Sequence, residues 1–201
     1  MIPRQIKEAI SIFSKFPTIG ERTATRFALY LLSLPEEKAE EVCQAVSALK
    51  TELKRCDFCF NPFTSARKEQ KLCEICRDKK RGKEKNICIV EKENDLWQME
   101  KTKKYQGRYF ILGGKMDFLK ENPLGKLRIE ELKKRLEEYR PKEIILAISP
   151  TVQGNLTMDY IKRILKPYDV KITKLAQGLT LGSEIEYTDE ETLESALEGR
   201  K

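Results

Sequence analysis

Four cysteines have the spacing of a metal site. Cys56 and Cys59 form one C-x2-C pair, and Cys73 and Cys76 form a second pair after a gap of thirteen residues. Each C-x2-C turn directs two thiolates at one ion, and four sulfur ligands leave no open position for a reacting water. The pattern therefore predicts a structural zinc ion, one per chain, with all four cysteines as ligands.

Two disulfides are the alternative use of these four cysteines. Disulfides need an oxidising compartment and are typical of small, loop-rich secreted domains. The chain starts with Met-Ile-Pro-Arg and shows no apolar signal segment, so we expect a cytoplasmic protein with reduced thiols. Cys43 and Cys88 lie in apolar patterns outside the cluster, and we expect both to be small core residues rather than ligands or nucleophiles.

The chain contains no histidine. This absence excludes the Ser-His-Asp and Cys-His arrangements of nucleophilic enzymes and every zinc site with a histidine ligand. Carboxylates, lysines, tyrosines, cysteines and bound ions remain as chemical tools, so catalysis is not the first expectation.

Glu91 is the candidate acid. It directly follows an apolar stretch at residues 87–90, where it could serve as a general acid or as a magnesium ligand. A two-metal phosphoryl-transfer site needs further carboxylates from neighbouring strand ends, and residues 149–155 contain none. Glu91 could equally cap the following helix or pair with a lysine, and both interpretations stay open.

The first third of the chain predicts three helices. Apolar residues recur at three- and four-residue spacing over residues 2–13, 21–32 and 34–53. Residues 15–20 break the period, which predicts a tight glycine turn at Gly20 between the first two helices. We expect Ser33 to cap the third helix, with Pro35 in its first turn.

The rest of the chain predicts a sheet domain. The basic run at 77–85 indicates a linker, with a phosphate contact as the alternative. Predicted strands at 87–91, 108–112, 143–148 and 171–175 alternate with predicted helices at 95–102, 129–139 and 157–165. Such alternation favours a mostly parallel sheet covered by helices on both faces. The expected fold class is therefore α+β and multidomain.

The composition favours a partner that carries negative charge. The chain has 201 residues, of which 40% are hydrophobic and 35% are charged, and its formal net charge is +7. This excess suits nucleic acid, although charges of both signs are mixed and a solvated surface explains much of them. No apolar run is long enough to cross a bilayer, so we expect a soluble protein without a membrane partner.

Several motifs occur in one order along the chain. They are Phe-Pro-Thr-Ile-Gly-Glu-Arg-Thr-Ala-Thr-Arg-Phe at 16–27, the four-cysteine segment, Ile-Val-Glu at 89–91, Tyr-Phe-Ile-Leu-Gly-Gly at 109–114, Pro-Thr-Val-Gln-Gly at 150–154 and Gly-Ser-Glu-Ile-Glu-Tyr-Thr-Asp at 182–189. In this order they resemble the RecR family of bacterial recombination proteins along nearly the whole chain. The resemblance implies a helix-hairpin-helix domain at 1–53, a four-cysteine zinc finger at 54–80, a Toprim domain at 81–176 and a C-terminal segment at 177–201 with a Walker B-like motif.

The same resemblance implies a non-catalytic, DNA-binding mediator of recombinational DNA repair. Members of the family act with RecO, and in many bacteria with RecF, to promote RecA loading onto single strands coated by single-strand-binding protein. Some assemble into ring-like tetramers, so we expect a homo-oligomer, either a dimer or such a ring. The basic positions of the family's hairpin fall on Arg22 and Arg26, which makes them the expected DNA contacts.

The chemistry of the hairpin agrees with that role. The start of its second helix exposes backbone N–H groups, and the positive end of the helix dipole favours a phosphate. Arg22 and Arg26 are one turn apart, so both can meet one backbone without reading its sequence. The alternative is a hairpin that only packs, with solvated arginines. Further basic residues that could touch DNA lie in the metal segment, namely Lys54, Arg55, Arg67 and Lys68.

The chain also departs from the family pattern. Gln153 stands where relatives commonly carry an acid, and Phe110 replaces their usual histidine. Both changes move the sheet domain away from metal chemistry. Two other function classes remain as alternatives: a Toprim-type magnesium-dependent phosphoryl-transfer enzyme that acts on DNA through Glu91, and a zinc-bearing scaffold that binds only proteins. The chain has neither an Asp-x-Asp pair nor a Gly-x-x-x-x-Gly-Lys loop, which speaks against catalysis.

Overall fold

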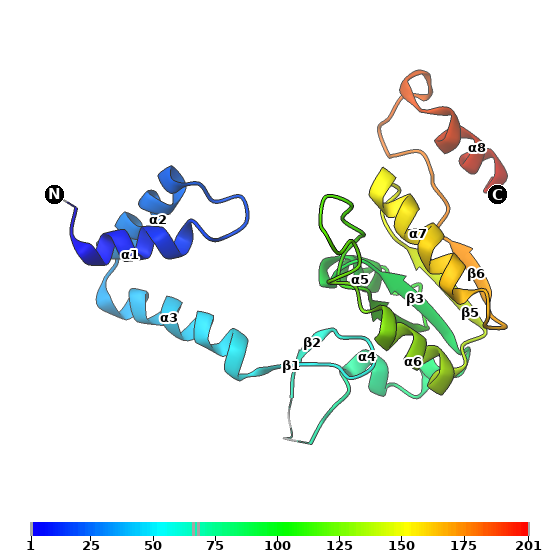
Figure 1. The fold of residues 1–201 in the computed structure, drawn as a ribbon, viewed down its shortest axis with the longest axis horizontal. Helices are drawn as coiled ribbons and strands as arrows, with labels where there is room; N and C mark the ends of the chain where they lie inside the picture. The colour runs from blue at the N-terminus through cyan, green and yellow to red at the C-terminus, as the bar shows by residue number, and fades with distance from the viewer. Residues whose placement is uncertain (1, 66, 68, 201) are drawn as a thin grey trace. The chain divides into compact units, whose positions relative to one another are not determined.

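The computed structural model describes residues 2–65, 67 and 69–200 (Figure 1). The chain divides into two compact units, Met1–Leu53 and Lys54–Lys201. Lys68, one of the basic residues considered for a DNA contact, lies outside the described residues. Among the described residues, no helix combines the length and the apolar character that a membrane span requires.

The first unit contains three helices, α1 (Arg4–Phe13), α2 (Glu21–Ser33) and α3 (Glu36–Thr51). The ring of Phe13 meets those of Phe16 and Phe27 edge to face, with centroids 6.0 and 6.2 Å apart. Ala24 and Ala28 are buried on α2, where their small side chains allow the close approach of α1. The predicted pair of helices is confirmed.

The turn between α1 and α2 does not use glycine as the sequence suggested. Thr18 is the residue in the left-handed region, with φ 65°, whereas Gly20 has φ −86° and forms the N-cap of α2. Backbone hydrogen bonds from Phe16 N to Phe13 O and from Ile19 N to Phe16 O close the turn. The prediction of a glycine turn is therefore wrong in its conformation. Gly20 is instead the residue before the first turn of α2. Since it has no side chain, none occupies the free backbone N–H groups of that turn.

The third helix also differs from the prediction. Ser33 ends α2, because its hydroxyl donates to Tyr30 O at 2.7 Å, and Pro35 is the N-cap of α3. Leu53 leaves the helix and begins strand β1. Cys43 is exposed rather than part of a core. The physical reason is that the apolar stripe of α3, which includes Val42, Val46 and Leu49, is itself exposed.

The second unit begins with the metal segment. Strands β1 (Leu53–Arg55) and β2 (Pro62–Thr64) form a two-stranded sheet, and the short helices α4 (Glu74–Arg77) and η1 (Lys80–Gly82) follow. The basic run at 77–85 is thus more than a linker. The guanidinium of Arg81 pairs with the Glu100 carboxylate and is largely buried, which fixes this run to the sheet domain.

A parallel sheet forms the centre of the second unit. Its strands are β3 (Asn86–Val90), β4 (Arg108–Ile111), β5 (Glu143–Ala147) and β6 (Lys171–Lys174), in the order β4-β3-β5-β6. All three strand pairs are parallel. The β-strands are connected by α5 (Glu93–Lys101), α6 (Ile129–Tyr139) and α7 (Val152–Leu165).

The strand order decides which face each helix covers. The chain moves one way along the sheet from β3 to β4 and the other way from β4 to β5 and on to β6. Because crossovers between parallel strands are right-handed, α5 covers one face while α6 and α7 cover the other (Figure 1). The predicted sheet with helices on both faces is confirmed. Its core includes Ile87, Cys88 and Ile89 of β3, all fully buried.

The C-terminal segment contains the 3-10 helix η2 (Ile185–Tyr187) and the helix α8 (Glu190–Glu198). The family resemblance implies a Walker B-like motif in this segment. In the structure, residues 185–187 form a single 3-10 turn, and Asp189 caps α8, because its carboxylate accepts from Thr192 N and from Thr192 Oγ1, each at 2.9 Å. Aspartate is one of the residues that favour a helix N-cap.

Candidate metal centre and nucleic-acid interface

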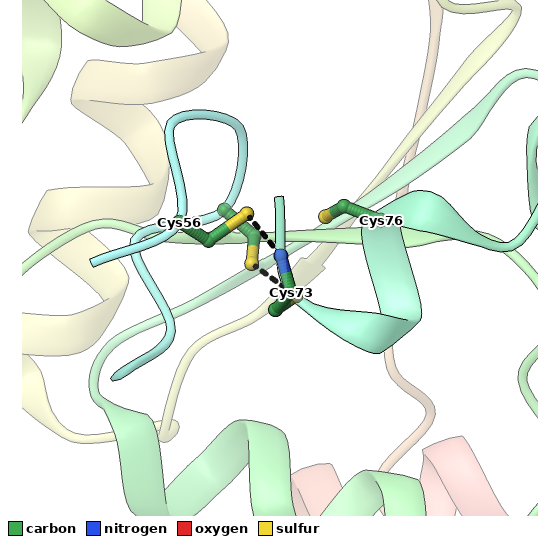
Figure 2. Close-up of side chains that lie close together, drawn as sticks. Cys56, Cys73 and Cys76 are labelled. Carbon is green, nitrogen blue, oxygen red and sulfur yellow. Dashed lines mark hydrogen bonds between the residues drawn. The ribbon is translucent and has the colours of Figure 1, made fainter. Parts of the chain in front are cut away.

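The structure brings the four predicted cysteines together. Their sulfur atoms all lie within 4.8 Å of one another, and all four side chains are buried. Figure 2 shows the sulfur of Cys76, on the helical turn α4, directed toward Cys73 and Cys56. A tetrahedral Zn²⁺ with Zn–S bonds of about 2.3 Å separates its sulfur ligands by about 3.8 Å. The four thiols therefore fit one structural metal ion.

Local backbone contacts set this geometry. Phe60 N donates to Cys56 O at 2.9 Å, and Phe60 adopts φ 64°, which folds the first C-x2-C turn back on itself. The Cys73 amide donates to Cys56 Sγ at 3.4 Å and links the second pair to the first. All six thiols of the chain are free, and the sulfur atoms of Cys59 and Cys73 are 3.5 Å apart. A disulfide needs about 2.05 Å, so this arrangement fits a metal cluster rather than two disulfides.

The four thiols of the cluster influence one another's charge. Hydrogen bonds with the neighbouring thiols, Cys59 foremost, lower the pKa of Cys56. Hydrogen bonds with Cys56, Cys59 and Cys73 raise the pKa of the Cys76 thiol. Four buried sulfurs thus cannot all become thiolates unless a positive charge balances them, and a divalent metal ion supplies that charge.

Aromatic residues between the cysteines fasten the metal segment to the sheet domain. Phe58 is buried between the guanidinium groups of Arg108 and Arg135, each within 5 Å of its ring centroid, and its edge meets Tyr139. Arg135 also donates to the Asp57 carbonyl. Sequence analysis missed this contact. The aromatic residue inside the first C-x2-C pair was the signal that could have pointed to it.

A second aromatic contact also joins the metal segment to the sheet domain. The ring of Phe60 meets Phe110 edge to face at 5.5 Å, with the Arg128 guanidinium over it at 4.7 Å. The backbone joins as well, because Ile111 N on the edge strand β4 donates to Cys59 O at 3.1 Å. Phe110, noted as a departure from the family pattern, therefore serves as a packing partner of the metal segment.

Arg22 and Arg26 lie on the first two turns of α2 and are both exposed. Among the described residues, neither takes part in an ion pair. The N-cap Gly20 has no side chain to occupy the first N–H groups of the helix. The helix start and the two guanidinium groups thus form a positive, accessible patch, which a phosphate backbone could occupy.

Glu91 is buried at the carboxyl end of β3. Its Oε1 accepts from Ser149 N at 2.6 Å, and its Oε2 lies 3.5 Å from the Lys115 ammonium. A pairing with a lysine is one of the alternatives that the sequence left open for Glu91. The two acids that follow it along the chain have other partners: Glu93 pairs with Arg55 at 2.7 Å, and Asp95 caps α5 by accepting from Lys92 N at 2.9 Å.

This arrangement does not fit a magnesium centre. A two-metal site requires several converging carboxylates with free oxygens, and the carboxylate of Glu91 is already engaged on both oxygens. In residues 2–65, 67 and 69–200, the cysteine cluster is the one group of three or more potential ligands close enough to hold a metal. Cys88 is no substitute nucleophile, because burial raises the pKa of its thiol to about 12 and keeps it protonated.

Three family models match most of the chain, outside the cysteine segment. The model described as RecR, helix-hairpin-helix matches residues 6–50, the model for the Toprim domain matches residues 85–176, and the model described as RecR, C-terminal matches residues 178–201.

Among curated proteins, several similar chains bear the name Recombination protein RecR. That of Bifidobacterium longum subsp. infantis is 39% identical over 98% of this chain and 95% of its own length. That of Chloroherpeton thalassium is 41% identical over 97% of this chain and 95% of its own, and that of Myxococcus xanthus is 38% identical over 100% of this chain and 99% of its own.

Proposed function

Because the chain belongs to the RecR family of recombination proteins, we propose that it is a non-catalytic, DNA-binding mediator of recombinational DNA repair. The observation that carries the proposal is the full-length similarity to relatives named for recombination, combined with an exposed basic patch on the helix-hairpin-helix domain.

We propose Arg22 and Arg26 as the DNA contacts. Two guanidinium groups one turn apart can both bind phosphates of one backbone, and the open N-terminus of α2 adds a third donor group. Contacts of this kind position the protein without reading bases, so binding is independent of DNA sequence. Arg55 of the metal segment is a weaker candidate, because its guanidinium already pairs with Glu93 at 2.7 Å.

The partners and the location follow from the family. The protein acts in the cytoplasm with RecO, and with RecF where that protein is present, to promote RecA loading. It works as a homo-oligomer, either a dimer or a ring-like tetramer. We retain the domain boundaries 1–53, 54–80, 81–176 and 177–201 as part of this proposal.

The ion of the cysteine cluster is zinc in this proposal. Four thiolates in a closed, buried site are the ligand set that structural zinc prefers. Four sulfur ligands leave no open coordination position for a reacting water. The ion therefore stabilises the segment and takes no part in chemistry.

The alternative function is a Toprim-type magnesium-dependent phosphoryl-transfer enzyme. The surroundings of Glu91 argue against it, because a lysine ammonium lies beside Oε2 and no second carboxylate converges on the site among the described residues. A cleavage assay on supercoiled and single-stranded DNA with Mg²⁺ separates the two. We expect no cleavage, and activity that the substitution Glu91→Gln abolishes would establish the enzyme instead.

The test of DNA binding is a salt titration of the full chain on single- and double-stranded DNA. We expect the double variant Arg22→Ala, Arg26→Ala to bind more weakly to every sequence. Each lost phosphate contact reduces the slope of log K against log salt by about one, so the slope should fall by about two.

A matched control removes two positive charges elsewhere in the same unit. Lys38 and Lys50 on α3 are exposed, and the variant Lys38→Ala, Lys50→Ala has the same net charge as the arginine variant. Its salt slope should stay close to that of the wild type. If both double variants lose affinity equally, the effect is one of net charge and the hairpin is not the binding site. A protein that shifts no DNA even at low salt is a protein-binding scaffold.

A further inference from the structure

Three strand ends meet at one cluster of polar side chains in the sheet domain, around the buried Glu91. Glu91 follows β3, Lys115 follows β4 and the turn of Ser149 and Thr151 follows β5. We call these four residues the strand-end site. In a parallel sheet the carboxyl ends of the strands lie at the same edge, which is where ligands of such folds bind.

The position of Lys115 is fixed from both sides. Gly113 and Gly114 have φ 102° and 143°, and Gly113 N donates to Glu91 O at 2.9 Å, so the chain turns directly at the end of β4. A side chain at Gly113 would come within 2.8 Å of the Lys126 carbonyl. On the other side of Lys115, Met116 N donates to Thr157 Oγ1 of α7 at 3.0 Å.

The ammonium of Lys115 links all three strand ends. It lies 3.5 Å from Glu91 Oε2 and donates to Thr151 Oγ1 at 3.2 Å. The same Thr151 oxygen accepts from Gly154 N at 3.1 Å and so caps α7. The Lys115 side chain is 24% exposed and that of Glu91 is 7% exposed, so this pair is largely shielded from water.

We propose that the ammonium of Lys115 is the resident cation of the strand-end site. It balances the buried carboxylate of Glu91 and holds the turn before α7 through Thr151. Glu91 and Lys115 are positioning residues in this arrangement, and the site has no role for Mg²⁺. The proposal does not depend on DNA binding by the hairpin.

The first test uses the zinc-loaded wild-type protein and Mn²⁺ as the probe, measured by the electron paramagnetic resonance signal of the free ion. We expect the wild type and Glu91→Gln to bind Mn²⁺ identically, because Lys115 already occupies the site. One additional Mn²⁺ on the wild type that Glu91→Gln removes would overturn the proposal.

The second test converts the strand-end site into a site that should bind a divalent cation. Lys115→Glu places a second carboxylate beside Glu91, so this variant should bind one Mn²⁺ more than the wild type, and its melting temperature should rise when Mg²⁺ is added. The wild type should melt at the same temperature with and without Mg²⁺. The control Lys104→Glu makes the same charge change on an exposed lysine at the opposite end of β4 and should gain no Mn²⁺.

A neutral variant measures the contribution of the charge. Lys115→Met keeps the length of the side chain, and loss of one partner of a shielded pair should lower the melting temperature by roughly 4–8 °C, without recovery in Mg²⁺. A folded Lys115→Glu variant that gains neither Mn²⁺ nor stability in Mg²⁺ contradicts the proposal. If that variant does not fold, the comparison of the wild type with Glu91→Gln decides alone.

Discussion

The cysteine cluster illustrates how burial limits the chemistry of single residues. Each thiol is surrounded by three others and is shielded from water, so its charge state depends on a shared ion rather than on its own pKa. Cys43, on the exposed surface of α3, has the same functional group in ordinary surroundings. A Cys→Ser substitution should therefore affect metal binding at the buried cluster and not at the exposed Cys43.

At this scale we predict that Cys73→Ser abolishes metal binding while Cys43→Ser does not. Elemental analysis should find about one zinc per chain in the wild type and in Cys43→Ser, and well below one in Cys73→Ser. Loss of a structural metal should also reduce the free energy of unfolding by about 4 kcal/mol or more, measured by denaturant titration. Equal zinc contents in the two variants would show that the cluster is not the metal site.

Among the elements, the metal segment and the edge strand β4 depend on each other. The edge strand has an open side, and the Cys59 carbonyl accepts from Ile111 N on that side. Phe58 and Phe60 add aromatic and guanidinium contacts to α6 and β4. The metal therefore stabilises a surface of the sheet domain as well as its own loops.

From this coupling we predict an order of loosening after zinc removal. Amide hydrogen exchange should accelerate first in residues 56–76, by at least about tenfold, and next at Ile111, which loses its acceptor when the segment moves. The amides of β5 and β6, and those of α1 and α2, should be unaffected. Addition of zinc after removal of the chelator should restore protection, whereas acceleration of equal size along the whole chain would refute the coupling.

On the scale of the whole molecule, the C-terminal segment exposes several apolar side chains. Leu179, Leu181, Ile185 and Tyr187 are all exposed, and Leu181 is fully so. Within the segment, a reciprocal pair of hydrogen bonds between Gln177 and Ser195 ties its start to α8. Apolar groups gathered on one exposed segment are typical of surfaces that are buried on assembly.

We therefore predict that truncation after Ala176 reduces the size of the oligomer. Light scattering should give a smaller number of chains per particle than for the full-length protein, beyond the loss of mass from each chain. The control is truncation after Glu198, which keeps α8 and should leave the number of chains unchanged. The same number of chains in all three proteins would exclude the segment from assembly.

Much of the fold could be predicted from local patterns. The helix at 129–139 matches α6 at both ends, and the order of strands and helices follows from apolar periodicity. The predicted cap of the third helix was wrong because a local hydrogen bond decided the outcome: Ser33 Oγ donates to its own helix. Such contacts depend on backbone conformation, which the residue type does not determine.

By itself, the sequence determined the ligand set of the metal site and the absence of histidine chemistry, because both depend on which residues are present and on their short-range spacing. Only the tertiary structure decided which groups contact the Glu91 carboxylate. Its partners Lys115 and Ser149 come from other strands, and they meet it because the strand order β4-β3-β5 brings three distant chain segments to one edge. Contacts of this kind arise from topology, which no local pattern encodes.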